Sequence, residues 1–447
     1  MPHAPLSRRL WALRSAASLL LLGSLLGGCG TKEDPDDSDS SSGNTATVRV
    51  VNATTQRTAV GLLIDELPRE TAIERDAASA TYRVTAGSHT IALTNSSGTT
   101  LTDASTTTFT AGSSTTLVAW TGDNSTVKYL SLNDLETAPA SGRTKLRVFH
   151  AARDAGTLDV HLTPATETLG DAPLLGNVTA GNGSTGFSTV NAGSHRLRVL
   201  KAGSVLDSDV RLDTMLTLPS AGVAALVITP STGGVLTHAL LLQPAQAVTA
   251  LTNKQARVRV VSALPSNQAA AASFNSTPLP LLGSSPAVGS YTLVPAGTSA
   301  PQLTVGGTTL TTEPWTAAAG SDNTLFVWGT SAAAQFKVFS DDNRLPTSAS
   351  ASRIRLLHGL GDVASELALD VAGSRATTAS QGTFSAVAQV AAATDTTVSV
   401  TQSTTATSVY QLTGKTLDAG GVYSVFLLGD SRQTSGNGLL STVIKER

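Results

Sequence analysis

The amino-acid sequence predicts an all-β protein: a tandem array of four immunoglobulin-like β-sandwich domains after a signal peptide and a flexible tether. Three observations predict this class. Only 14% of the 447 residues are charged and 4% are aromatic, while Thr, Val and Gly, which favour strands and tight turns, are abundant. Short segments alternate apolar and polar residues, as half-buried strands do, and no helical periodicity follows the signal peptide. The third observation is an internal repeat.

The repeat opens with an apolar-Arg-apolar-apolar strand that occurs four times, at Arg49, Arg147, Arg259 and Arg355. A turn follows each arginine at intervals of 38, 46, 38 and 38 residues. A second Ala-Gly turn then precedes an apolar strand in every unit. Landmarks in one order at near-constant spacing indicate homologous domains. About six or seven strand segments per unit match an immunoglobulin-like sandwich, with an open barrel as the alternative.

These landmarks divide the chain into six segments. The predicted segments are a signal peptide (1–28), a lipidated cysteine with an acidic, Ser-rich tether (29–45) and four β-domains (46–138, 144–243, 255–346 and 352–447). Because the linkers between domains are short, we expect neighbouring domains to sit end to end as a rod.

The N-terminus has the features of an export signal. Three arginines precede an apolar run from Ala16 to Leu26, which is too short to be a membrane-spanning helix. The run leads into a motif that resembles the bacterial lipobox, in which the signal is cut before an acylated cysteine. An ordinary secretory signal with a chance cysteine is the alternative. The lipobox residues are Leu26, Gly27 and Gly28, and the lipidated residue is Cys29.

Cys29 is the chain's one cysteine, so no internal disulfide can form. Acyl chains such as palmitate on this residue would anchor the protein to the membrane. No aspartate follows Cys29, and by the same resemblance the outer membrane is the expected destination. Removal of residues 1–28 leaves 27 basic and 32 acidic residues, a net charge of −5. A protein with this net negative charge lacks the excess of positive charge that binding to the phosphates of nucleic acid requires.

The opening arginine has apolar neighbours on both sides, so we expect one face of its strand in a core and the other partly covered. In three units an aspartate follows 12 to 16 residues later, an offset that fits two strands joined by a loop. We therefore predict cross-strand structural pairs rather than a ligand site. The predicted pairs are Arg49 with Asp65, Arg147 with Asp159, and Arg355 with Asp370; the third unit has Asn275 instead.

The repeat resembles the bacterial domain of unknown function DUF4397. The segments that carry this likeness are Arg147–Ala152, Leu158–His161 and Ala192–His195, followed by an Ala-Gly turn and a Val-rich strand. The likeness extends from about residue 46 to residue 444, although the Ser-Pro-Asp that often follows the opening strand is incomplete. The resemblance implies an exported, often lipid-anchored protein of tandem β-domains, and it implies no catalytic residue.

The sequence motifs predict no catalytic residue, no metal site and no cofactor. The histidines are scattered without short-spaced ligand pairs. His150 and His358 occupy equivalent positions after the opening strand, and we interpret them as imidazoles that bond to a turn backbone. The nucleophile elbow of serine hydrolases is missing, and no glycine-rich piece is followed by a helix and a lysine.

Two functions stay open. The first is a non-catalytic, lipid-anchored envelope protein that binds an envelope protein, glycan or surface polymer through strand edges and loops. The alternative is a carbohydrate or small-ligand binding module, which would need a cluster of exposed aromatics drawn from Trp120, Trp315 and Trp328.

Overall fold

The structure is a computed structural model that describes residues 43–447 except 56, 168, 170–173, 182–184, 245, 266–267, 282, 331–332 and 436. The predicted signal peptide, lipobox and Cys29 lie outside the described residues. The described chain is almost wholly β-structure, arranged as separate small sheets that pair into sandwiches, which confirms the predicted fold class. Within these ranges no helix has the length and apolar character needed to cross a membrane.

Unit 1 contains two four-stranded sheets, ordered β4-β1-β7-β8 and β3-β2-β5-β6. Its elements are β1 (Thr45–Ala53), β2 (Ala59–Ile64), β3 (Leu67–Glu74), β4 (Tyr82–Thr85), β5 (Gly87–Thr94), β6 (Ser105–Phe109), β7 (Ser114–Thr121), the short helix η1 (Asp123–Ser125) and β8 (Val127–Asn133).

Unit 2 has the sheet orders β12-β9-β15-β16-β17 and β11-β10-β13-β14. Its elements are β9 (Arg143–His150), η2 (Arg153–Ala155), β10 (Leu158–Thr163), β11 (Leu174–Val178), β12 (Ser188–Asn191), β13 (Gly193–Lys201), η3 (Asp207–Asp209), β14 (Val210–Leu218), β15 (Gly222–Pro230), β16 (Thr237–Leu242) and β17 (Thr249–Leu251).

Unit 3 has the orders β21-β18-β27-β28, with β22 also on β18, and β20-β19-β24-β25, together with the small sheet β23-β26. Its strands are β18 (Gln255–Ser262), β19 (Ala270–Phe274), β20 (Thr277–Leu279), β21 (Ala287–Val288), β22 (Thr292–Pro295), β23 (Gly297–Ser299), β24 (Gln302–Val305), β25 (Thr308–Leu310), β26 (Trp315–Ala317), β27 (Asp322–Thr330) and β28 (Ala333–Asp341).

Unit 4 has the orders β32-β29-β36-β37, with β33 also on β29, and β31-β30-β34-β35. Its strands are β29 (Ala351–Leu360), β30 (Leu367–Val371), β31 (Ser374–Ala379), β32 (Thr383–Phe384), β33 (Ala388–Ala391), β34 (Ala393–Gln402), β35 (Ser408–Leu417), β36 (Val422–Ser435) and β37 (Asn437–Lys445).

The sheet that holds the opening strand is called here the inner sheet of its unit, and the other main sheet the outer sheet. In all four inner sheets the opening strand pairs in parallel with the strand after the second Ala-Gly turn: β1 with β7, β9 with β15, β18 with β27, and β29 with β36. The three sequence landmarks therefore mark one repeated piece of sheet geometry.

The inner sheets are apolar on both faces because they contribute to two cores. In β1, Val48 and Val50 face the core of unit 1, while Val51 and Ala53 belong to a second cluster shared with Phe149 of unit 2. A corresponding shared cluster joins Val261 and Phe326 of unit 3 to Leu357 and Phe426 of unit 4. The predicted two-sided burial of the opening strand is thus present, and its outer cover is the inner sheet of another unit.

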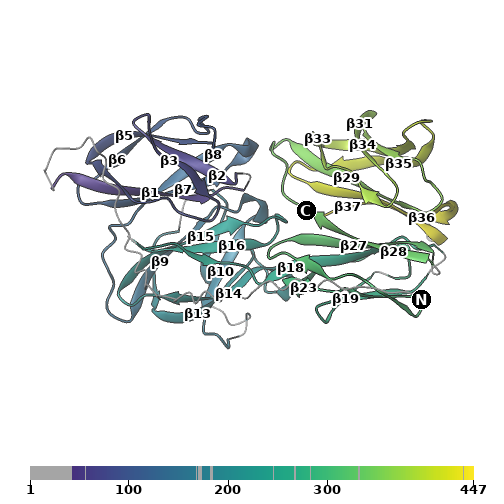
Figure 1. The fold of residues 1–447 in the computed structure, drawn as a ribbon, viewed down its shortest axis with the longest axis horizontal. Helices are drawn as coiled ribbons and strands as arrows, with labels where there is room; N and C mark the ends of the chain where they lie inside the picture. The colour runs from purple at the N-terminus through teal and green to yellow at the C-terminus, as the bar shows by residue number, and fades with distance from the viewer. Residues whose placement is uncertain are drawn as a thin grey trace, which may run out of the picture.

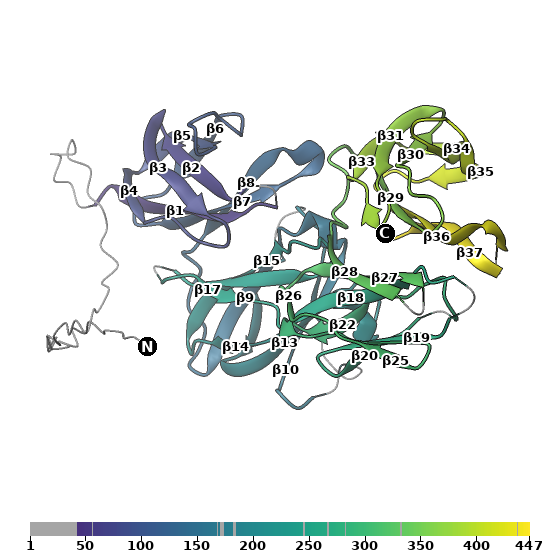
Figure 2. The same ribbon diagram turned by 45° about the vertical axis from the view of Figure 1, so that its right-hand side comes forward.

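The units consequently do not form an end-to-end rod, and that expectation is wrong. Figure 1 shows units 1 and 2 stacked on one side of the molecule and units 4 and 3 stacked on the other. Figure 2 shows units 2 and 3 side by side with units 1 and 4 as separate lobes above them. A short linker also permits a fold-back, and the apolar outward faces favour it because stacking removes them from water.

Units 2, 3 and 4 meet at a polar junction. The linker between units 3 and 4 is held on unit 2, because the Leu345 amide donates to Asp154 Oδ1 at 2.9 Å and Arg153 Nη1 donates to the Pro346 carbonyl at 3.2 Å. Arg447 Nη1 donates to the carbonyl of Gly234 in unit 2 at 3.0 Å. Hydrogen bonds between side chains and backbone groups therefore join the three units.

Candidate functional site

The opening arginines lie on the outward face of the inner sheet, at the interface between stacked units. Arg49 of unit 1 donates to the carbonyls of Gln243 and Gln246, after the last long strand of unit 2, at 2.7 and 2.5 Å. In return, Arg147 of unit 2 donates to the carbonyl of Asn133 at the end of β8 at 3.1 Å. The Arg147 guanidinium also lies 3.7 Å from the carboxylate of the next residue, Asp134.

Units 3 and 4 repeat this exchange with full ion pairs. Arg259 Nη2 lies 2.9 Å from Glu446 Oε1, just after β37, and Arg355 Nη1 lies 2.8 Å from Asp341 Oδ1 at the end of β28. The Arg259 guanidinium also stacks 4.4 Å from the Tyr291 ring. Each unit therefore holds its stacked neighbour through one arginine, and receives the neighbour's arginine at or just after its strand β8, β16, β28 or β37.

Charge pairing keeps this buried interface ionised. Burial alone would lower the pKa of Arg259, but the Glu446 carboxylate beside it raises that pKa above its ordinary value. Burial would raise the pKa of Asp341, but Arg355 and Arg259 outweigh it and lower that pKa. Nearby Asp322 is also fully buried, and there burial prevails over its ion pair with Arg257 and raises the pKa to about 6.

A hydroxyl on the neighbouring parallel strand orients three of the four arginines. The Nε groups of Arg49, Arg259 and Arg355 donate to Thr116, Thr324 and Ser424, each at 3.0 Å. The residue in register with Arg147 is Ala225, and Arg147 Nε is buried without a hydrogen-bond partner among the described residues. Unit 2 thus lacks one contact that the other three units make.

The structure does not bring together the predicted Arg–Asp pairs, which is a correction to the sequence analysis. Consecutive strands β1 and β2, β9 and β10, and β29 and β30 belong to opposite sheets, so the arginine and the following aspartate face different neighbours. Asp65 accepts from His89 Nδ1 at 2.6 Å, Asp159 from Asn177 Nδ2 at 2.7 Å, and Asp370 from Arg375 Nε at 2.7 Å. These aspartates hold local turns and strand contacts within their own units.

The equivalent histidines bond to backbone, as interpreted from the sequence. His150 Nε2 donates to the Gly156 carbonyl at 2.7 Å, and His358 Nε2 donates to the Ser365 carbonyl at 3.2 Å. Burial lowers the pKa of His150 to about 4, so this imidazole is neutral at pH 7. Over the described ranges no three His, Cys, Asp or Glu side chains lie close enough to hold a metal ion.

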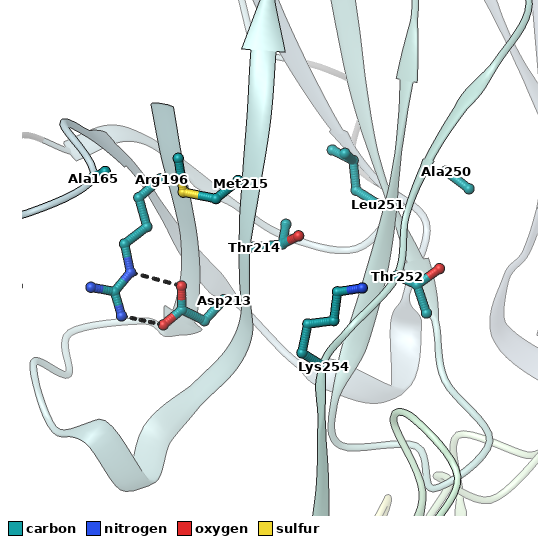
Figure 3. Close-up of a pocket in the computed structure, with 9 residues that line it drawn as sticks. All are labelled: Ala165, Arg196, Asp213, Thr214, Met215, Ala250, Leu251, Thr252 and Lys254. Carbon is teal, nitrogen blue, oxygen red and sulfur yellow. Dashed lines mark hydrogen bonds and ion pairs between the residues drawn. The ribbon is translucent and has the colours of Figure 1, made fainter. Parts of the chain in front are cut away.

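A groove recurs in three units where the edge strand of the inner sheet diverges from the edge strand of the outer sheet. Groove 1, about 660 Å³, lies between β8 and the segment that leads into β6. Groove 2, about 540 Å³, lies between β17 and β14 (Figure 3). Groove 3, about 440 Å³, lies between β28 and the segment from β25 to β26. Each groove lies between the edges of the two sheets, although in unit 2 the edge of the inner sheet is the additional strand β17 and not β16, the counterpart of β8 and β28.

The three grooves also share a side-chain composition. Each is lined by one lysine, one acid, at least two threonines and at least two larger apolar or aromatic residues. The lysine and acid are Lys128 and Asp103 in groove 1, Lys254 and Asp213 in groove 2, and Lys337 and Glu313 in groove 3. The larger residues are Leu101 and Tyr129 in groove 1, Leu251 and Met215 in groove 2, and Leu310, Trp315 and Phe336 in groove 3.

In groove 2 the acid is held by an additional arginine. Figure 3 shows Arg196 and Asp213 joined on one side of the pocket, with Lys254, Thr252 and Leu251 on the other. The Arg196–Asp213 bonds are 2.8 and 2.5 Å long. Sequence reasoning missed these grooves because each combines residues of two edge strands far apart in the chain. The one signal was a lysine beside an aromatic residue late in units 1 and 3, Lys128 before Tyr129 and Lys337 after Phe336.

The tryptophans do not form one exposed cluster. Trp120 contacts Phe149 across the interface of units 1 and 2, and Trp328 stacks on Phe326 beside the interface of units 3 and 4. Trp315 alone of the three lines one of the grooves described above, and its ring lies edge-on to Phe274 at 5.1 Å.

The fold and grooves define a multidomain β-sandwich protein with repeated surface grooves. Residues 46–161 match the family model described as "Domain of unknown function (DUF4397)", so the chain contains a DUF4397-like region. The match runs from unit 1 into β10 of unit 2, and it includes both Arg49 and Arg147. No curated protein matches the sequence.

Several solved structures resemble parts of the chain weakly. A candidate cell adhesion protein of Bacteroides uniformis aligns at 12% identity over 45% of this chain and 99% of its own, with a TM-score of 0.21. The fimbrial anchor protein Mfa2 of Porphyromonas gingivalis aligns at 10% identity over 68% and 97%, with a TM-score of 0.16. The TIE protein of Bacillus anthracis aligns at 10% identity over 83% and 68%, with a TM-score of 0.14. Scores this low carry no argument about function.

Replacement of Arg259 by Met should destabilise the protein strongly. The Arg259 and Glu446 side chains are only 2% and 4% exposed, and loss of one partner leaves a buried charge, at a cost of about 3–5 kcal/mol. The matched control is Arg432→Met, whose side chain is 75% exposed and whose loss should cost at most about 1 kcal/mol. Denaturant midpoints measure both variants, and equal shifts would contradict the structural role of Arg259.

Replacement of Ala225 by Ser should stabilise the protein by about 1 kcal/mol, because the new hydroxyl can accept from the unpaired Arg147 Nε. The control is Ala224→Ser, which places a hydroxyl in the apolar core of unit 2 and should destabilise. Thermal unfolding distinguishes the two variants. A lower melting temperature for Ala225→Ser would show that the missing contact is not the one described.

Proposed function

We propose that the protein is a non-catalytic, lipid-anchored cell-envelope protein whose repeated grooves bind an envelope protein. The observation that carries this proposal is the recurrence of one groove, with one lysine, one acid and at least two larger apolar or aromatic residues, between the sheet edges of three units. A partner with a repeated surface could occupy several grooves at once, which raises its apparent affinity without new contacts.

The arrangement of ionisable groups also supports a binding role over catalysis. The strongly buried charges described above hold units together, and the equivalent histidines bond to backbone carbonyls. The grooves contain exposed lysines and threonines instead, which suit hydrogen bonding and charge pairing with a polypeptide surface. The carbohydrate alternative draws its support from Trp315 and Phe336 in groove 3 and from Tyr129 in groove 1.

The groove proposal is tested by cross-linking in intact envelopes, followed by capture of the protein. The chain with Lys128→Glu, Lys254→Glu and Lys337→Glu should recover at least tenfold less of a defined protein partner than the unchanged chain. The control is Lys201→Glu, which reverses an exposed lysine away from the grooves. Equal recovery by both variants would contradict the proposal, and retention on a glycan array would favour the carbohydrate alternative.

The lipid anchor makes a separate prediction. Cys29→Ser removes the acylated thiol predicted from the lipobox, and two or more acyl chains are what hold such a protein stably on a membrane. The variant should move from the membrane fraction to the soluble fraction on cell fractionation. A Thr31→Ser variant, altered beside the lipobox but with its cysteine intact, should stay with the membranes. Continued membrane association of the Cys29→Ser protein would refute the anchor.

A further inference from the structure

Unit 2 carries a feature that extends its inner sheet. The short strand β17 comes from the chain that leads to unit 3, and it pairs antiparallel with the edge strand β16. Leu251 of β17 lies opposite Ala239 of β16, is 7% exposed, and packs in the core of unit 2. An extended segment with a leucine anchor therefore occupies this sheet edge.

The sheet registers identify the position of Ala239 in the other units. The residue three positions after each opening arginine is paired with a residue of the parallel strand, and that residue is in turn paired with one of the next strand, at the edge. The edge-strand residues found in this way are Tyr129 in β8, Ala239 in β16, Phe336 in β28 and Ser441 in β37. Two units thus carry a large aromatic residue at this position, and two carry a small one.

A large residue at this position lets the edge strand itself complete the core of its unit, whereas a small residue does not. Tyr129 and Phe336 pack against the cores of units 1 and 3. In unit 2 the small Ala239 leaves room, and Leu251 from β17 supplies the apolar side chain. Ser441 in unit 4 is likewise small, and it lies between Leu439 and Val443, which share its face of the strand and pack against the unit 4 core.

The edge of β37 is also open along its backbone. From Ser441 to Lys445 each residue of β37 has one register partner, in β36, whereas Leu439 nearer the turn is in register with both Gly429 and Ser435. No backbone hydrogen bond joins residues 441–445 to any other segment in the part of the chain that the structure describes. An edge strand with unpaired amide and carbonyl groups is a template for another strand.

We propose that the free edge of β37 is a strand-addition site for an extended segment of a partner protein, with a leucine-sized side chain flanked by small residues that enters beside Ser441. The occupant is defined by β17, whose Thr-Ala-Leu sequence sits on the equivalent edge of unit 2. This site is separate from the three grooves, so its test does not depend on them.

The test uses a labelled synthetic peptide with the sequence of residues 247–253 and the full chain carrying Cys29→Ser. Fluorescence anisotropy should show saturable binding. Ser441→Tyr, which installs the residue found at the unit 1 position, should weaken binding at least tenfold, and so should a peptide with Ser in place of the leucine. Ser441→Ala is the matched control and should bind like the unchanged chain. All proteins should keep the same melting temperature within error.

A cross-link locates the bound peptide. With Cys29 replaced, the chain has no cysteine, so Ser441→Cys adds a single thiol. With dissolved oxygen as the oxidant, a peptide with Cys in place of the leucine should form a disulfide with this thiol, since residues directly opposite on antiparallel strands lie within disulfide range. Thr442→Cys points to the other face and should react at least tenfold less. The proposal would be overturned if the peptide showed no saturable binding, or if Ser441→Tyr left the binding unchanged.

Discussion

An arginine on the outward face of each opening strand holds the molecule together. Because its neighbours in the strand are apolar on both faces, this guanidinium is buried once two inner sheets stack, and a buried guanidinium needs an acceptor. The stacked unit supplies an acceptor just after one of its strands: the carbonyls of Gln243 and Gln246, after β16, for Arg49, and the Glu446 carboxylate, after β37, for Arg259. Since each unit also receives its neighbour's arginine, the contact is reciprocal and fixes the register of one sheet on the other.

This constraint explains why the four units form two stacked pairs instead of a rod. The shared apolar clusters around Phe149 and Phe426 provide the hydrophobic driving force, which has little directional preference. The arginine contacts determine how the two sheets are oriented, because the planar guanidinium forms good hydrogen bonds in few geometries. The bonds from the linker and from Arg447 to unit 2 then join the two pairs.

The stacking also determines which surfaces stay available for binding. The inner faces are covered, and the exposed features are the sheet edges: three grooves between diverging edge strands and the open backbone of β37. Unit 2 shows how such an edge is occupied, because its own linker contributes Leu251 where the edge strand has only Ala239. Proteins usually protect free edges, and in units 1 and 3 the bulky Tyr129 and Phe336 at least fill the space beneath them.

The sequence alone determined the sandwich class, the fourfold repeat and the two-sided burial of the opening strand, because each depends on local periodicity and on residue types at fixed spacing. It did not determine the partners of the arginines. The offset of Asp65 from Arg49 fits two neighbouring strands equally well whether they share a sheet or cross between sheets, and the chain crosses. Asp341 and Glu446, which pair with the arginines, come from the far ends of other units. Contacts across the stacked sheets depend on which faces meet, and only the tertiary structure decides that.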